Sequence, residues 1–148
     1  MVIIHKARWA NRTNPSPTAR LVKHVAPNVV LSALRHRKGL SVLQVALAAG
    51  LRARQVYAVE SHKPCPESWA TLVRVAAVFG AKVEPRGHSR FCKRAASVAD
   101  EAGVSLETAQ SVIAFLGEPC ATSQLRVCDI AAVTGSLGGS IVIVEEGS

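Results

Sequence analysis

The stretch GLSVLQVALAAGLRARQVYAVES, residues 39–61, decides how the chain folds. Ser41 stands directly before an apolar helical run, where its side chain can cap the helix N-terminus. Gly50 ends that run, because glycine adopts the left-handed conformation of a helix stop without strain. A second helix is predicted to begin at about Ala53, and small alanines allow the two helices to cross closely. The stretch therefore predicts a helix-turn-helix, a motif whose second helix can lie in the major groove of DNA.

The start of the second helix is polar and positively charged. It carries Arg52, Arg54 and Gln55 at positions that are expected to be exposed. The guanidinium group of arginine matches the O6 and N7 acceptors of guanine, and the amide of glutamine matches adenine. These side chains are therefore candidates for contacting DNA, although an ordinary solvated helix surface would carry the same residue types.

Residues 28–84 as a whole resemble the XRE family, the helix-turn-helix of the phage repressor and Cro type. The shared pattern is an arginine in the first helix, Gly-Leu-Ser, an alanine-containing second helix, and Ala-Gly-Leu before the recognition helix. A glutamate ends the recognition helix, and TLVRVAAVFG (71–80) resembles the fourth helix of the family. The resemblance implies a five-helix domain that binds operator DNA, usually as a homodimer.

The resemblance also implies roles for individual residues. Arg35 and Glu60 match an ion pair that ties the first helix to the end of the recognition helix. Four residues match the base-facing positions of the family: Ala53, Arg54, Gln55 and Ala58. Five residues are expected at DNA phosphates: Ser41, Gln44, Arg52, Lys38 and Lys63. Arg52 replaces the usual Ser or Thr cap of the recognition helix, which weakens the cap by ~1 kcal/mol.

The positive charge of the chain is concentrated before residue 97. The net charge is +8, but residues 1–96 sum to +14, with 17 Lys and Arg residues against three Glu residues. Residues 97–148 sum to −6, with one arginine against seven acidic residues. A basic segment of this density favours a polyanionic partner, nucleic acid first and an anionic membrane surface second. Solvated surface charge is the alternative, since a charge count alone does not identify a partner.

Part of the chain is an internal repeat. VALAAGLRARQVYAV from Val45 aligns with VADEAGVSLETAQSV from Val98, and both contain the glycine that ends the first helix. After a two-residue insertion, VAAVFG (75–80) aligns with IAAVTG (130–135). The two copies predict two similar helical units. They differ at the start of the recognition helix, where the second copy has SLET in place of RARQ.

These patterns predict a mainly α fold: a lambda-repressor-like helix-turn-helix bundle, a second small helical unit that is a degenerate repeat, and a short terminal β-strand. Four segments are expected along the chain: a basic N-terminal arm (1–27), the helix-turn-helix domain (28–84), a linker (85–96), and an acidic helical unit for dimerisation or protein interaction (97–148).

Local signals add detail to this plan. The terminal strand SIVIVE (140–145) is expected to pair with its symmetry mate or with VII (2–4). Asn28 is expected to cap the first helix of the DNA-binding domain, and Thr18 a short helix in the arm. The segment AKVEPRGHSR (81–90) is interpreted as a linker.

Several function classes are disfavoured. The four cysteines form no CxxC pair and have no zinc-finger spacing, so we expect reduced thiols, no metal and no cofactor. The sequence shows no paired carboxylates of a polar pocket, no nucleophile-base set and no phosphate-binding glycine loop, so an enzyme is not expected. No apolar run approaches the ~20 residues of a membrane span, and no secretory signal is recognisable, so we expect a cytoplasmic protein without membrane contact.

The sequence therefore predicts a transcriptional regulator that binds double-stranded operator DNA through a helix-turn-helix, as a homodimer. The alternative is a protein of another functional class: an antitoxin or anti-activator whose acidic C-terminal half (97–148) binds a protein partner.

Overall fold

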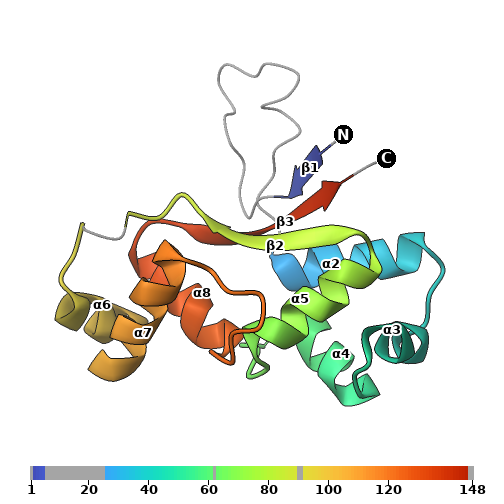
Figure 1. Cartoon of the computed structure of the whole chain (residues 1–148), viewed down its shortest axis with the longest axis horizontal. Helices are drawn as coiled ribbons and strands as arrows, with labels where there is room; N and C mark the ends of the chain where they lie inside the picture. Colours follow the sequence, from blue (N-terminus) through green and yellow to red (C-terminus); the bar gives the residue numbers. More distant parts are fainter. Residues whose placement is uncertain (1, 6–25, 62, 90–91, 147–148) are drawn as a thin grey trace.

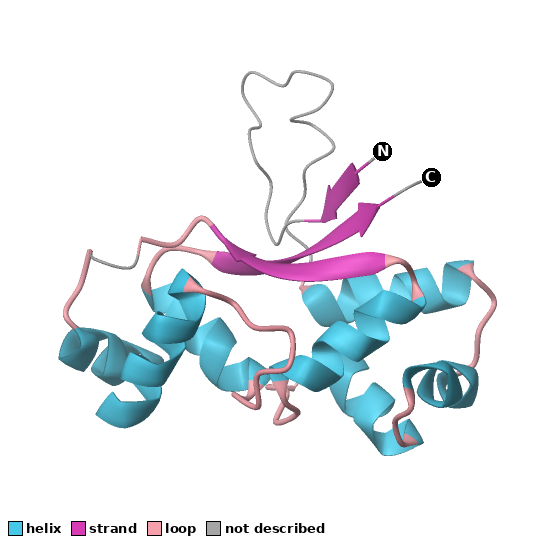
Figure 2. Ribbon diagram, in the orientation of Figure 1, coloured by secondary structure: helices cyan, strands magenta, loops and turns pink. Residues whose placement is uncertain are grey.

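The fold is mainly α, with a small sheet on one side of the helices (Figure 1, Figure 2). The computed structural model describes residues 2–5, 26–61, 63–89 and 92–146. Within these ranges it contains seven helices: α2 (Pro27–Arg37), α3 (Val42–Ala49), α4 (Ala53–Glu60), α5 (Trp69–Val78), α6 (Ala95–Ala102), α7 (Leu106–Gly117) and α8 (Val127–Ser136). The three strands in the same ranges are β1 (Val2–His5), β2 (Ala81–Arg86) and β3 (Ser140–Glu146).

The terminal strand β3 is the centre of the sheet. The strand order is β1-β3-β2, and both neighbours are antiparallel to β3. Strand β1 pairs with it from Val2 opposite Glu146 to His5 opposite Ile143. Pairing with the N-terminal VII segment was one of two predicted alternatives, and the structure shows it. The two ends of the described chain therefore meet in one sheet.

Strand β2 corrects the sequence interpretation, which assigned residues 81–90 to a linker. Ala81 lies opposite Glu145 and Arg86 opposite Ser140, so the first half of that segment is paired along its length. Pro85 and several charged residues hide the strand pattern in the sequence. Proline lacks an N–H group and is tolerated in edge strands, which is the position of β2 in the sheet. The predicted linker over 85–96 is correspondingly shorter, and α6 already begins at Ala95.

The start of α2 also differs from the prediction. Asn28 was expected to cap this helix, but the helix begins two residues earlier than predicted, with Ala26 in the cap position and no side-chain cap. Pro27 fits the first helical position because its missing N–H would have no intrahelical partner there. The short helix expected after Thr18 lies outside the described residues.

The repeat appears as two helical units that share their first two helices in register. The first unit contains α3, α4 and α5, and the second contains α6, α7 and α8. Gly50 ends α3 with φ 70°, and Gly103 ends α6 with φ 70°, so the same left-handed stop recurs 53 positions later. Helix α4 and its counterpart α7 begin at Ala53 and Leu106, again 53 positions apart.

The third helices of the two units follow a different register. Helix α5 begins at Trp69 and α8 at Val127, which is 58 positions later, whereas the sequence alignment of VAAVFG with IAAVTG implied 55. Helix α7 has 12 residues against eight in α4, which delays the helix that follows. The alignment slipped by three residues, nearly one helical turn, so apolar residues still matched apolar residues.

A local two-fold axis relates the two units. The N–H of Trp69 donates to the carbonyl of Leu125 at 2.8 Å, and the N–H of Val127 donates to the carbonyl of Glu67 at 2.9 Å. If each residue is replaced by its counterpart 58 positions away in the other unit, each of these two hydrogen bonds becomes the other. The bridge between Ser68 and Arg126 also joins residues 58 positions apart, as does the pairing of residues 84 and 142 in the sheet. Both of these pairs therefore lie on the axis.

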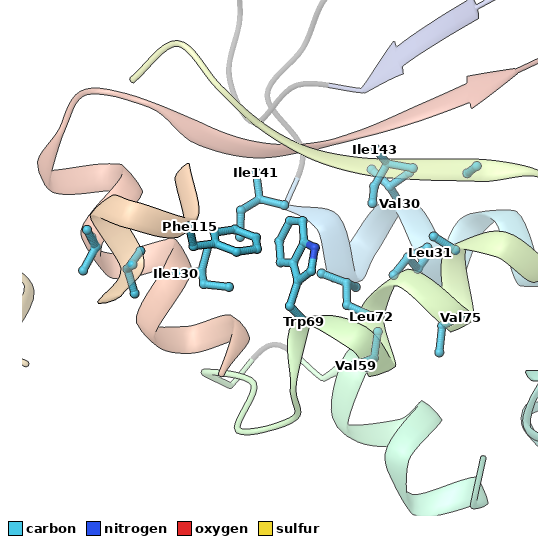
Figure 3. Packing of buried hydrophobic residues seen from close by; sticks show 14 of the residues in the cluster. Val30, Leu31, Val59, Trp69, Leu72, Val75, Phe115, Ile130, Ile141 and Ile143 are labelled. Atoms are coloured by element: carbon cyan, nitrogen blue, oxygen red, sulfur yellow. The ribbon is translucent and has the colours of Figure 1, made fainter. Parts of the chain in front are cut away.

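One hydrophobic core runs through both units. Trp69 is 2% exposed and contacts the ring of Phe115 edge-on, with the ring centroids 5.2 Å apart. Figure 3 shows Trp69 between two groups: Phe115, Ile130 and Ile141 on one side and Leu72 on the other. A buried indole contributes several kcal/mol through the area it removes from water. This contact holds α5 of the first unit against α7 of the second.

Candidate nucleic-acid interface

The helix-turn-helix is formed by α3 and α4. Val45 and Ala46 of α3 are buried, as are Val56 and Val59 of α4, so the two helices share an apolar contact. Arg52 and Arg54 are exposed at the N-terminal end of α4. Figure 1 shows α4 on the side of the molecule opposite the sheet. This side therefore presents a positively charged helix start.

The ion pair between Arg35 and Glu60 fixes the far end of α4. Nε of Arg35 lies 2.8 Å from Oε2 of Glu60, and a second guanidinium nitrogen lies 3.0 Å from Oε1. The third nitrogen donates to the carbonyl of Leu40 at 3.0 Å. The hydrogen bond with Glu60 raises the pKa of Arg35. The guanidinium thus connects α2, the turn before α3 and the end of α4, which is the contact that the family resemblance implied.

The start of α3 uses its polar side chains in a cap. Oγ of Ser41 accepts from the N–H of Gln44 at 3.1 Å, and Oε1 of Gln44 accepts from the N–H of Ser41 at 2.7 Å. This reciprocal pair is a capping box. Both residues are exposed, as their predicted place at DNA phosphates requires. The cap uses only the acceptor oxygens of these side chains, so the hydroxyl group of Ser41 and the Nε2 group of Gln44 can still donate to a phosphate.

Gln55 has a structural role that the sequence did not indicate. Its Oε1 accepts from the N–H of Arg52 at 2.9 Å, and its Nε2 donates to Oε1 of Glu67 at 3.3 Å. The side chain of Arg52 makes no cap hydrogen bond. Gln55 therefore satisfies the N–H of the cap residue Arg52, whose own side chain contributes nothing to the cap. To read an adenine, the amide of Gln55 would have to leave both Arg52 and Glu67.

Tyr57 belongs to the exposed face of α4 and was missed by the sequence interpretation. Its side chain is 63% exposed, and it follows Arg54 by three positions and Ala53 by four. Residues at these spacings lie on the same face of a helix. Ala53 and Ala58 are only half-buried. The three-residue spacing from Arg54 was the available signal in the sequence.

The two predicted phosphate-binding lysines lie outside α4. Lys38 follows α2 in its C-cap position, and Lys63 lies in the connection between α4 and α5. Both are exposed. The N–H of Lys63 donates to Oγ of Ser61 at 3.2 Å, which orders the chain directly after α4. The structure thus leaves both ammonium groups accessible, one on each side of the helix-turn-helix in the sequence.

The second unit presents a different surface at the start of its recognition-like helix. Oγ of Ser105 accepts from the N–H of Thr108 at 3.0 Å and caps α7. Leu106 and Glu107 follow as exposed residues. A carboxylate at this position is favourable for the helix dipole but repels phosphate. Of the two corresponding helices, α4 therefore begins with exposed positive charge and α7 does not.

The part of the chain that the structure describes shows neither a metal site nor a membrane-spanning helix. Among these residues, no group of three or more His, Cys, Asp or Glu side chains could hold a metal ion. In the same residues, no helix has the length and apolar character to cross a bilayer. All four cysteines are free thiols. Burial raises the pKa of Cys65, whereas hydrogen bonds with Thr122 lower the pKa of Cys120.

Comparisons with known proteins identify no relative. No family model matches the chain, and neither a curated protein nor a solved structure matches it.

Proposed function

We propose that the chain is a sequence-specific transcriptional regulator that binds double-stranded DNA through α4. The observation that carries the proposal is the exposed, positively charged start of a helix whose other end is fixed by the ion pair of Arg35 and Glu60. A rigidly held helix with free arginines at its N-terminal end suits insertion into a major groove.

The exposed residues of α4 divide into two roles. Arg54 is the candidate for a bidentate contact with guanine, and Tyr57 offers an aromatic edge to a thymine methyl group. Arg52, which precedes the helix, is placed to meet a phosphate. Gln55 positions the helix start through its cap hydrogen bond rather than reading a base.

A mobility-shift experiment after selection from random duplexes tests this assignment. Arg54→Ala is expected to relax the preference at one base pair, at a cost of about 1–3 kcal/mol. Lys63→Ala is expected to weaken all sequences alike and to reduce the salt slope by about one. Arg86→Ala is the matched control, because it removes one positive charge from strand β2, on the opposite side of the molecule. Failure of the wild type to enrich any motif would disprove the proposal.

The alternative, an antitoxin or anti-activator, is favoured by one observation on the second unit. Leu106 is 47% exposed beside the exposed Glu107, and a carboxylate at this helix start would repel a phosphate, which favours a partner other than DNA. In that case Leu106→Glu would abolish co-purification of a partner protein, and Arg54→Ala would leave it intact. Loss of the partner with Arg54→Ala and its retention with Leu106→Glu would exclude this alternative.

A further inference from the structure

The local two-fold axis gives the second unit the place of a second subunit. In two-fold dimers of helix-turn-helix proteins, the symmetry places two recognition helices on the same face of DNA. Here α7 is the counterpart of α4, and Figure 1 shows both helices on the side opposite the sheet, toward opposite ends of the molecule. A single chain therefore has the arrangement that two copies usually form.

The contacts along the axis are already made within the chain. The backbone hydrogen bonds around Ser68 and Arg126 join the two units on the axis. Strand β3 is paired on both edges, by β1 and by β2. Trp69 packs against Phe115 and Ile130 of the second unit. The surface of the first unit that lies along this axis is consequently covered by the second unit and not open to another copy.

The two recognition positions carry opposite charges. Arg52, Ala53 and Arg54 begin the first, and the corresponding residues of the second are Ser105, Leu106 and Glu107. If α7 approached DNA as α4 does, Glu107 would face phosphates and oppose binding. The two units are related by a two-fold axis, but of the helices α4 and α7 only α4 carries the charge that suits a DNA groove.

From this combination we infer that the chain binds DNA as a monomer on a single, asymmetric half-site. The inference rests on the proposed DNA-binding function, and it replaces the homodimer that the family resemblance implies. The second unit completes the core and occupies the position of the missing subunit without reading bases.

The first experiment measures the stoichiometry and the symmetry of binding for the full chain. Selection from random duplexes is expected to enrich a motif without an inverted repeat, and sedimentation of the complex is expected to give one chain per duplex. An inverted repeat bound by two chains would overturn the monomer inference and leave the DNA-binding function standing. No enriched motif would overturn the DNA-binding function and the inference with it.

The second experiment tests whether α7 can be converted into a helix that binds a DNA half-site. The double substitution Leu106→Ala and Glu107→Arg copies the start of α4 and keeps the cap between Ser105 and Thr108. The wild type is expected to have the same affinity for each half-site, whether the duplex carries one half-site or two. The variant is expected to prefer the two-site duplex by about tenfold, at one spacing near one helical turn.

Two controls keep this second experiment decisive. Glu107→Gln removes the negative charge without adding an arginine and is expected to give a much smaller preference. Unchanged affinity of the double variant for the one-site duplex shows that it has folded. A folded double variant that gains no preference at any spacing would overturn the assignment of α7 to the second half-site.

Discussion

The two helical units share a scaffold and differ on their surfaces. Val45 and Ala46 are buried in α3, and Val98 and Ala99 are buried at the corresponding positions of α6. The helix starts that follow have diverged from RARQ to SLET. Buried residues thus preserve the crossing of the helices, while the exposed residues at the starts of α4 and α7 differ in charge.

The units also differ in how their recognition helix is held. In the first unit, α2 contacts α4 through Arg35 and Glu60. In the second unit, Ile113 stands in the position of Glu60, and the described residues between β2 and α6 form no helix that could match α2. Helix α7 instead extends by four residues and brings Phe115 to Trp69. One helix is held by an ion pair, and its counterpart is held by apolar packing.

The largest expected effect concerns the contact between the units. Trp69→Ala should lower the free energy of unfolding by about 3–5 kcal/mol, because it leaves a cavity in the shared core. Its two-fold counterpart Val127 is only half-buried, and Val127→Ala should cost about 1–2 kcal/mol. Urea unfolding followed by far-UV circular dichroism measures both. Equal effects would show that Trp69 does not join the units.

The next effect concerns the ion pair that only the first unit possesses. Glu60→Ala should destabilise the protein by about 3 kcal/mol, since it leaves the guanidinium of Arg35 largely buried without its carboxylate. Asp129→Ala is the control, because Asp129 pairs with the exposed side chain of Arg126, and such pairs contribute less than about 1 kcal/mol. Comparable losses in urea unfolding would contradict the structural role of the Arg35–Glu60 pair.

The capping residues offer a finer comparison of the two helix starts. Gln55→Ala should cost about 1 kcal/mol of stability through the lost cap of α4, and Ser105→Ala should cost a similar amount at α7. Gln55→Ala should leave the selected DNA motif unchanged. A lost adenine preference with unchanged thermal stability would instead show that Gln55 reads a base.

The smallest effect concerns the loops that follow the two recognition helices. Burial raises the pKa of Cys65 in the first loop, and hydrogen bonds with Thr122 lower the pKa of Cys120 in the second. A lower pKa gives a larger thiolate fraction at pH 8, and the thiolate is the reactive form. Mass spectrometry after brief alkylation should therefore find Cys120 modified before Cys65. The reverse order would contradict the placement of Cys65 between the units.

Local signals explain what could be predicted from the sequence. Ser41, Gly50 and the start of α4 at Ala53 depend on residues within one or two turns, so capping and glycine rules were sufficient. Strand β2 was missed because it exists through its pairing with β3, nearly 60 residues later. Its own sequence, with Pro85, resembles a loop.

In the candidate site too, contacts between residues distant in the sequence were not predictable from local signals. Arg35 and Glu60 were predicted from the family pattern, since that pattern encodes a contact between distant helices. The cap bond of Gln55 to the N–H of Arg52 repeats that of Gln44 to the N–H of Ser41, but its second partner, Glu67, comes from the next connection, which local sequence does not reveal. The exposure of Tyr57 depends on which face of α4 is packed against α3, which helical spacing alone does not decide.

The central claim is that the first unit alone reads DNA, through Arg54. The most direct measurement is parallel selection from random duplexes with the wild type, Arg54→Ala and Glu107→Ala. We predict that the wild type and Glu107→Ala enrich the same motif and that Arg54→Ala loses a guanine preference at one position. A motif that changes with Glu107→Ala and persists with Arg54→Ala would contradict the claim.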